Sequence, residues 1–145
     1  MTRAMFAQVL ANLEGIDLAA FANVSPSFED VSADAWYFAA VQWAAEMGIV
    51  RGVGDGNFDP SRPITREQMA VMLHRYITIR DIEIPRDETT EFIDQADISY
   101  WAVDAVGAIQ AAGIIQGNNG AFSPQNNATR AEVATIFARF LNLIR

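Results

Sequence analysis

Three arginines, each preceded by a threonine at a predicted helix start, are the residues best suited to binding chemistry. They are Arg3, Arg66 and Arg130. Free backbone N–H groups and the helix dipole favour an anion at a helix N-terminus, and a guanidinium can hold a carboxylate through two parallel hydrogen bonds. The pattern therefore predicts carboxylate recognition at these starts. The alternative is that each arginine pairs with Asp30, Asp94 or a glutamate and only stabilises its helix.

Two tryptophans and two aspartates recur along the chain with these arginines. Trp36 and Trp101 could stack on the face of a sugar, but their place within an apolar helical stripe favours packing in the core. Asp30 and Asp94 are expected to cap a helix or brace a loop, with groove lining as a second role.

The composition excludes several other classes of site. The 145 residues carry a formal net charge of −8 and no cysteine, and all ten basic residues are arginine. An acidic chain is poorly suited to nucleic acid, and no apolar stretch is long enough for membrane insertion. Asp55 opens a calcium-like Asp-x-Asn-x-Asp motif, but Arg66 stands where a bidentate glutamate is required. No recurring acidic pair suggests catalysis, so we expect no enzyme, no metal and no cofactor.

An internal repeat sets the elements that must position these residues. The segment 28–66 recurs as 92–130, with an offset of 64 residues at Phe28 and Phe92. Residues 2–13 match only the second half of this unit. The chain therefore holds two full repeats and part of an earlier one.

Each full repeat is predicted to form a helix, a loop and a second helix. Apolar residues at helical spacing predict the first helix over residues 36–47, which Gly48 would end. A threonine followed three residues later by Gln or Glu marks the second helix start, at Thr65 in the first full repeat. Thr2, followed by Met5, lacks this pattern.

Loops and linkers separate these helices. Phe58 and Phe122 are expected to anchor the glycine-rich loops to the core. A short helix is expected near residues 18–22. The chain is interpreted as one domain, 1–145, with a partial-repeat helix at 1–14, full repeats at 28–79 and 92–143, and linkers at 15–27 and 80–91.

The repeats differ at two helical positions. Trp43 corresponds to Ala108 in the next repeat, and we expect it in the core or in a contact between repeats. His74, the only histidine, stands where the other units have Ala11 and Ala138. A residue present in one copy alone is expected at the surface or an interface.

The motifs resemble the S-layer homology (SLH) repeat. Phe-x-Asp-Val, Trp, Gly-Ile-Val-x-Gly, Asp-Gly-x-Phe-x-Pro and Ile-Thr-Arg stand in this order through residues 28–77, and with departures through residues 92–141. The resemblance implies an all-α domain in which helix-loop-helix repeats form a pseudo-threefold, three-pronged arrangement, with the first repeat truncated here.

The resemblance also implies a function, a noncovalent anchor that binds a secondary cell-wall polysaccharide. Such glycans often carry a pyruvate ketal, whose carboxylate would suit the three arginines. The resemblance further implies that the ligand approaches the backbone at Gly52 and Gly117, for which a positive-φ turn is the alternative. It places the protein outside the cell, at the bacterial surface, in the wall or S-layer.

Two other functions stay open. The chain could be a structural interaction module, in which another SLH chain or the missing repeat segment covers the apolar face of residues 6–13 and completes the threefold. It could instead bind peptidoglycan. The partners expected are thus a cell-wall polysaccharide or another SLH segment.

Overall fold

The computed structural model describes residues 1–145 as an all-helical protein, which confirms the predicted fold class. The chain folds as two compact units, Met1–Ile64 and Thr65–Arg145. Each unit begins with the second helix of one repeat and continues into the first helix of the next. No helix of the chain has both the length and the apolar character that crossing a bilayer requires.

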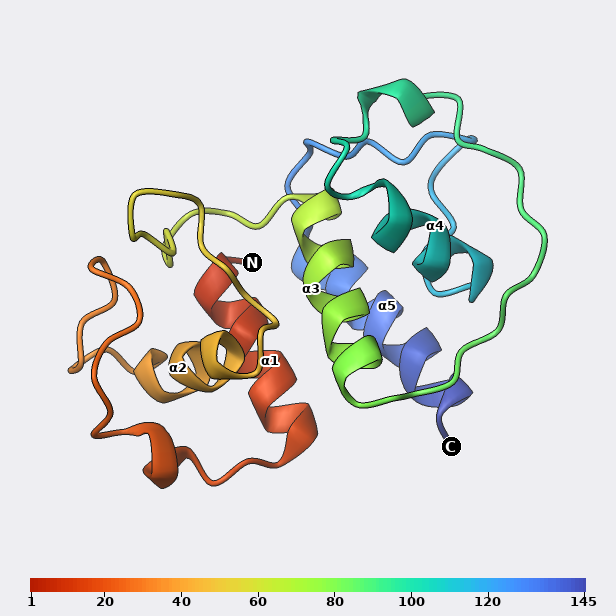
Figure 1. Cartoon of the computed structure of the whole chain (residues 1–145). Helices are drawn as coiled ribbons and strands as arrows, with labels where there is room; N and C mark the ends of the chain where they lie inside the picture. Colours follow the sequence, from red (N-terminus) through yellow and green to blue (C-terminus); the bar gives the residue numbers. More distant parts are fainter. The chain divides into compact units, whose positions relative to one another are not determined.

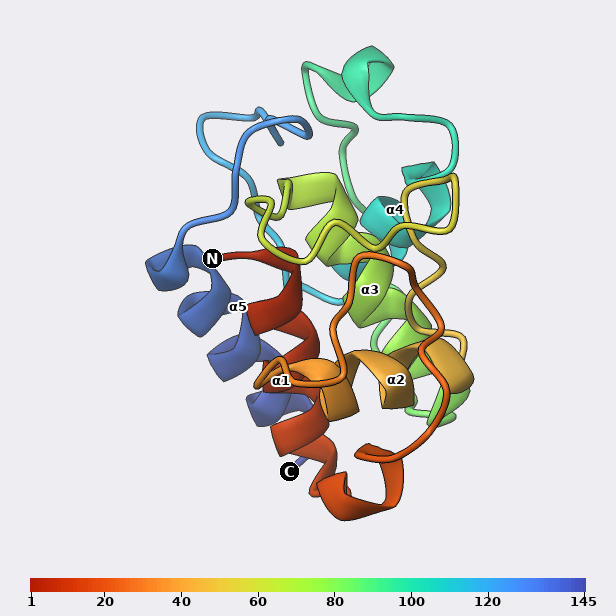
Figure 2. The same cartoon turned by 90° about the vertical axis from the view of Figure 1, so that its left-hand side faces the viewer.

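Unit 1 contains α1 (Arg3–Glu14), the 3₁₀ helix η1 (Leu18–Phe21) and α2 (Phe38–Glu46), as Figure 1 shows. Its core forms where α1 packs against α2. The predicted short helix is confirmed as η1, which packs against α2 and is seen from another side in Figure 2.

The start of α1 differs from the prediction. Thr2 Oγ1 accepts a hydrogen bond from Met5 N at 3.1 Å, and Thr2 N donates to Met5 Sδ at 3.5 Å. A methionine sulfur therefore takes the place of the expected Gln or Glu side chain, although sulfur is a weaker acceptor.

The first helix of the repeat begins later than its apolar spacing predicts. Helix α2 starts at Phe38 and has no side-chain cap, whereas the prediction began at residue 36. Trp36 lies in the preceding turn and 63% of its surface is exposed. Its spacing relative to the buried Trp43 therefore does not reflect a shared helical face.

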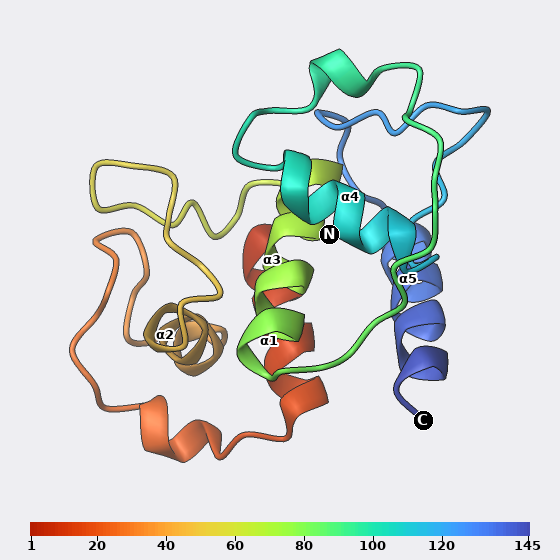
Figure 3. The ribbon, with the colours of Figure 1, turned by 45° about the vertical axis from the view of Figure 1, so that its right-hand side comes forward.

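Unit 2 contains α3 (Arg66–Ile79), η2 (Gln95–Asp97), α4 (Val103–Ala111) and α5 (Arg130–Leu143). Helix α3 packs against α4, and an edge-on contact between Tyr76 and Phe140 joins α3 to α5. The capping boxes predicted at the starts of α3 and α5 are both present. Residues 82–91 run from α3 towards η2 without a helix (Figure 3).

Candidate functional site

Two of the predicted arginines hold the loop of the following repeat. Arg3 Nε donates to the carbonyl oxygen of Phe58 at 2.9 Å, and its guanidinium lies 4.8 Å from the centre of that ring. Arg66 repeats both contacts on Phe122, at 2.6 Å and 5.2 Å. Each contact combines a charge-assisted hydrogen bond with a cation–π interaction.

Loop carbonyls also take up the helix-start N–H groups that were expected to favour an anion. Arg3 N donates to the carbonyl of Arg62 at 3.0 Å. Arg66 N donates to the carbonyl of Asn126 at 2.9 Å. The starts of α1 and α3 therefore serve loop attachment, and their backbone donors are already used.

The two aspartates brace the same loops, as predicted. Asp30 accepts hydrogen bonds from the backbone N–H groups of Phe58 and Asp59 at 2.8 and 2.7 Å. Asp94 accepts the same pair from Phe122 and Ser123. Asp59 and Ser123 both adopt positive φ, a conformation uncommon outside glycine, so the aspartate side chains help to hold a strained turn.

Burial alone would raise the pKa of the Asp94 carboxyl. The backbone donors from Phe122 and Ser123, together with the charge of Arg66, outweigh this effect and lower the pKa of Asp94 below its ordinary value. Asp94 is therefore held as a carboxylate that supports the loop.

The conserved geometry of the two loops within this chain requires glycine at positions 52 and 117. Gly52 has φ of +83°, and a Cβ there would lie 2.6 Å from the carbonyl oxygen of Asn57. Gly117 has φ of +72° and is equally close to the carbonyl oxygen of Ala121. The positive-φ turn is therefore present, and the backbone also approaches itself closely.

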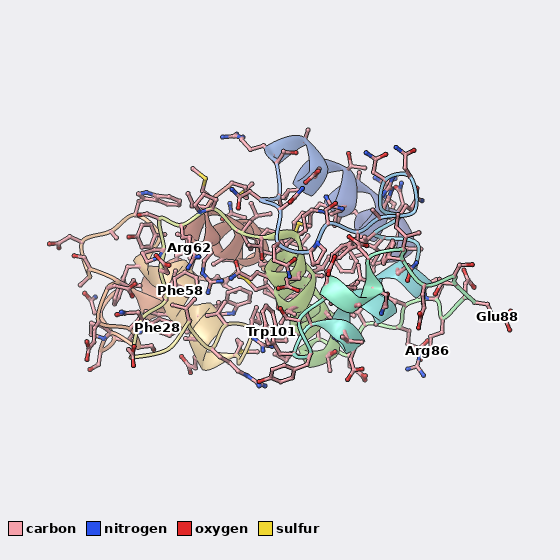
Figure 4. All side chains as sticks on the ribbon, turned by 90° about the horizontal axis from the view of Figure 1, so that it is seen from above. Phe28, Phe58, Arg62, Arg86, Glu88 and Trp101 are labelled. Carbon is pink, nitrogen blue, oxygen red and sulfur yellow. The ribbon has the colours of Figure 1, made fainter.

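Two phenylalanine pairs fill the space beneath these loops. The rings of Phe28 and Phe58, both labelled in Figure 4, lie 5.3 Å apart. Phe92 and Phe122 repeat this pair at 5.3 Å. Phe58 and Phe122 are fully buried, which confirms their predicted role as loop anchors.

The expectation that both repeat tryptophans pack in the core is wrong. Trp36 is exposed and makes an edge-on contact with Tyr37 at 5.1 Å, and 46% of Trp101 is exposed. Both lie in turns that precede α2 and α4 rather than on the buried helical stripe. Their rings are therefore accessible to a ligand.

A groove of about 560 Å³ lies in unit 2 between the Phe122 loop and α5. Arg66 enters it from the start of α3, where its Nη1 pairs with Glu132 Oε1 at 2.9 Å. The side chain of Arg66 is 12% exposed. Because Nε and Nη1 already have partners, the remaining N–H donors of the guanidinium are the ones a ligand can use.

Helix α5 supplies a wall of the groove that the sequence interpretation missed. Glu132, Thr135, Ile136 and Arg139 line it at the helical spacing i, i+3, i+4, i+7. Arg139 Nη1 donates to the carbonyl of Ile114 at 3.3 Å. The recurrence of an arginine at Arg75, the same place in the preceding repeat, was the available signal.

The groove carries a local charge opposite to that of the chain. Its charged lining residues are Arg66, Arg139 and Glu132, so it holds two cations and one carboxylate. The other polar lining groups are mostly amides and hydroxyls, from Gln116, Asn118, Ser123, Asn126, Asn127, Thr129 and Thr135. This mixture suits hydroxyl-rich ligands that also carry an anionic group.

The third predicted arginine has different surroundings. Arg130 is exposed and is not among the residues that line the groove. Neither its side chain nor its backbone N–H makes the loop contacts seen at Arg3 and Arg66. Of the nine predicted site residues, the groove brings together Arg66 and Gly117.

Among the comparisons with known proteins, one family model matches more than half of the chain. The family model described as "S-layer homology domain" matches residues 27–70 and 91–134. The chain is 36% identical over 143 residues to an endoglucanase of Bacillus sp. (strain KSM-635), covering 97% of this chain and 15% of that protein.

Two surface-layer proteins are also similar. The chain is 28% identical to the S-layer protein sap of Bacillus anthracis, covering 99% of the chain and 16% of that protein. It is 33% identical to the surface-layer 125 kDa protein of Lysinibacillus sphaericus, covering 96% and 12%. The chain thus corresponds to less than a fifth of each of these relatives.

Proposed function

The chain belongs to the S-layer homology domain family, and from this we propose that it is a noncatalytic module that anchors a larger protein noncovalently to the cell wall. Its location is the cell surface, as for the S-layer and surface-layer relatives. The endoglucanase activity in one relative's name belongs to that protein, of which this chain matches 15%.

The ligand proposed is a secondary cell-wall polysaccharide that carries a pyruvate-ketal carboxylate. The observation that supports this choice most directly is the pair of arginines, Arg66 and Arg139, in a groove otherwise lined by amides and hydroxyls. The carboxylate would bind the remaining donors of Arg66, and the sugar hydroxyls would bind the amides near Gly117. The exposed ring of Trp101 offers a stacking surface for a sugar in the same unit.

The other predicted arginines have separate places in this proposal. The guanidinium of Arg3 is covered, since the residue is 5% exposed, so its part is to hold the loop of residues 52–63 with Asp30 and Gly52. Trp36 remains a proposed stacking surface in unit 1. Arg130 is accessible to an anion but lies outside the groove.

Calorimetric titration with a pyruvylated N-acetylmannosamine glycan tests this proposal. We expect Arg66→Ala to weaken binding at least tenfold, or about 1.4 kcal/mol. Arg145→Ala is the matched control, because it removes the same charge from an exposed position of the same unit outside the groove. Equal binding by the Arg66→Ala variant and the unmutated chain would contradict the assignment.

Because Arg66 also holds the Phe122 loop, a second variant keeps that contact intact. Glu132→Gln removes the carboxylate that pairs with Arg66 and leaves the guanidinium over the ring of Phe122. We expect equal or tighter glycan binding by this variant, since a negative charge leaves the groove. Retention by purified walls stripped of their polysaccharide would instead indicate peptidoglycan and contradict the proposed ligand.

A second function, docking of another SLH segment, is favoured by the start of α5. The N-terminal arginines of α1 and α3 each hold a loop through the carbonyl of a phenylalanine, Phe58 or Phe122, whereas Arg130 holds no such loop. Under this proposal another SLH chain supplies the loop. Sedimentation velocity should then show concentration-dependent association that Arg130→Ala weakens, and a well-folded monomer at every concentration would contradict it.

A further inference from the structure

Unit 2 contains a second pocket that shares no residue with the groove. Its volume is about 750 Å³, and it lies between the end of α3, the linker that follows and α4. Its apolar wall is formed by Ile77, Ile82, Ile84, Ala108 and Ala111. The imidazole of His74 also lines it.

The corresponding place in unit 1 holds a tryptophan. Ala108 occupies the position of Trp43 in the repeat, with the same offset of 65 residues that separates Trp36 from Trp101. Trp43 is 4% exposed, so its indole is buried in the folded chain. The exchange of an indole for a methyl group removes side-chain volume from the helix pair in unit 2.

The linker before α2 and the linker before α4 also differ in how they cover these helices. In unit 1 the linker forms η1, which packs against α2, the helix that carries Trp43. In unit 2 the residues that line the pocket, 81–86, form no helix. The segment that covers α2 in unit 1 therefore has a more open counterpart beside α4.

We propose that this pocket is a binding site for a neutral, planar aromatic ring of about the size of indole. Internal symmetry supports the size, because the equivalent position of the other repeat, Trp43, holds a buried indole. Cavities lined by aliphatic side chains bind aromatic rings: an engineered cavity of about 150 Å³ of this kind binds benzene.

The charges around the pocket disfavour an anionic ligand. Asp81, Glu83 and Arg86 belong to its lining, so two carboxylates and one guanidinium surround it. Arg86 is exposed, and its side chain projects away from the ribbon in Figure 4. A ring N–H could donate to the imidazole of His74 or to either carboxylate.

Titration with indole, followed by two-dimensional NMR of the whole chain, tests the site. We expect saturable shifts of the Ala108 and Ala111 methyl signals. Ala108→Trp should fill the pocket, weaken indole binding at least tenfold and raise the melting temperature. Ala138→Trp is the matched control, because this exposed alanine of α5 lies outside the pocket and should leave indole affinity unchanged.

Two further experiments complete the test. If the Ala108→Trp variant does not fold, Ala111→Leu also reduces the volume of the pocket and should weaken indole binding several-fold. N-acetyltryptophanamide distinguishes the source of the ring: binding of both probes indicates a pocket that also accepts a tryptophan side chain, and binding of indole alone indicates a small molecule. Binding of neither probe, or an unchanged indole affinity in the filled variants, would overturn the proposal.

Discussion

The arginine contacts of unit 1 and unit 2 use the same atoms in different surroundings. Arg3 and Arg66 each donate from Nε to a phenylalanine carbonyl and lie over that phenylalanine ring. Arg3 is covered, and burial lowers the pKa of its guanidinium, although the charge of Asp59 acts in the opposite direction. Arg66 instead meets Glu132 at the edge of a groove.

This difference separates two roles that the Thr-Arg motif alone does not distinguish. The loop contact is common to both units, so it follows from the repeat. The groove contact needs an additional wall, which α5 supplies in unit 2. Variants that act on one contact and spare the other should therefore separate stability from ligand binding.

The largest expected effect comes from the phenylalanines beneath the arginines. Phe58→Ala and Phe122→Ala each remove a fully buried ring, and each should lower the free energy of unfolding by about 3–5 kcal/mol. Urea denaturation followed by circular dichroism measures both. Phe122→Ala should also weaken glycan binding, because Phe122 lines the groove. A loss below about 1 kcal/mol in either variant would contradict their role as loop anchors.

Removing the arginines should distinguish the two contacts more sharply. Arg3→Ala leaves a carbonyl in a buried setting without its donor, and we expect a loss of about 2–3 kcal/mol in unfolding free energy. Arg66→Ala should cost about 1–2 kcal/mol, because water can reach part of the site. Calorimetry should show the opposite order for glycan affinity, with the larger loss in Arg66→Ala. Equal losses of stability in the two variants would contradict the explanation that burial makes the Arg3 contact the stronger one.

Asp94 gives the comparison a pH dependence. The pKa of Asp94 is lower in the folded chain than the ordinary 3.8. The carboxylate therefore contributes fully to stability at a pH above its pKa in the unfolded chain, and this stability is lost as the pH falls through its pKa in the folded chain. Asp94→Asn should therefore cost about 1.5 kcal/mol at neutral pH, from the hydrogen bonds to Phe122 and Ser123. The difference from the unmutated chain should shrink below about pH 4. Urea midpoints across pH 2–7 measure it, and a constant difference would contradict the assignment.

Local patterns in the sequence predicted the second helices and their caps. The reason is that these features depend on residues within three or four positions of one another, as Thr65 and Gln68 do. The loop anchors Phe58 and Phe122 were predicted because an isolated aromatic residue within a glycine-rich loop needs a buried place. Asp30 and Asp94 were expected to brace loops, which the hydrogen bonds confirm.

Features that join distant residues were not predictable in the same way. Arg66 contacts Phe122 across a sequence separation of 56 residues, and no local pattern specifies that partner. The exposure of Trp36 and Trp101 follows from turns that delay the helix start, which an apolar stripe does not reveal. The exchange of Trp43 for Ala108 is visible in the sequence, but the second pocket also depends on the path of the linker, which no local pattern specifies.

The smallest expected effect compares the caps of α1 and α3. At α1 the backbone N–H of Thr2 meets the sulfur of Met5 at 3.5 Å, whereas at α3 that of Thr65 meets the amide oxygen of Gln68 at 3.1 Å. Met5→Gln should therefore complete a stronger capping box and raise the unfolding free energy by about 0.5 kcal/mol. Gln68→Met is the matched reverse change and should lower it by a similar amount. The same urea titration measures both, and a loss of stability in Met5→Gln would show that packing of the methionine side chain outweighs its part in the cap.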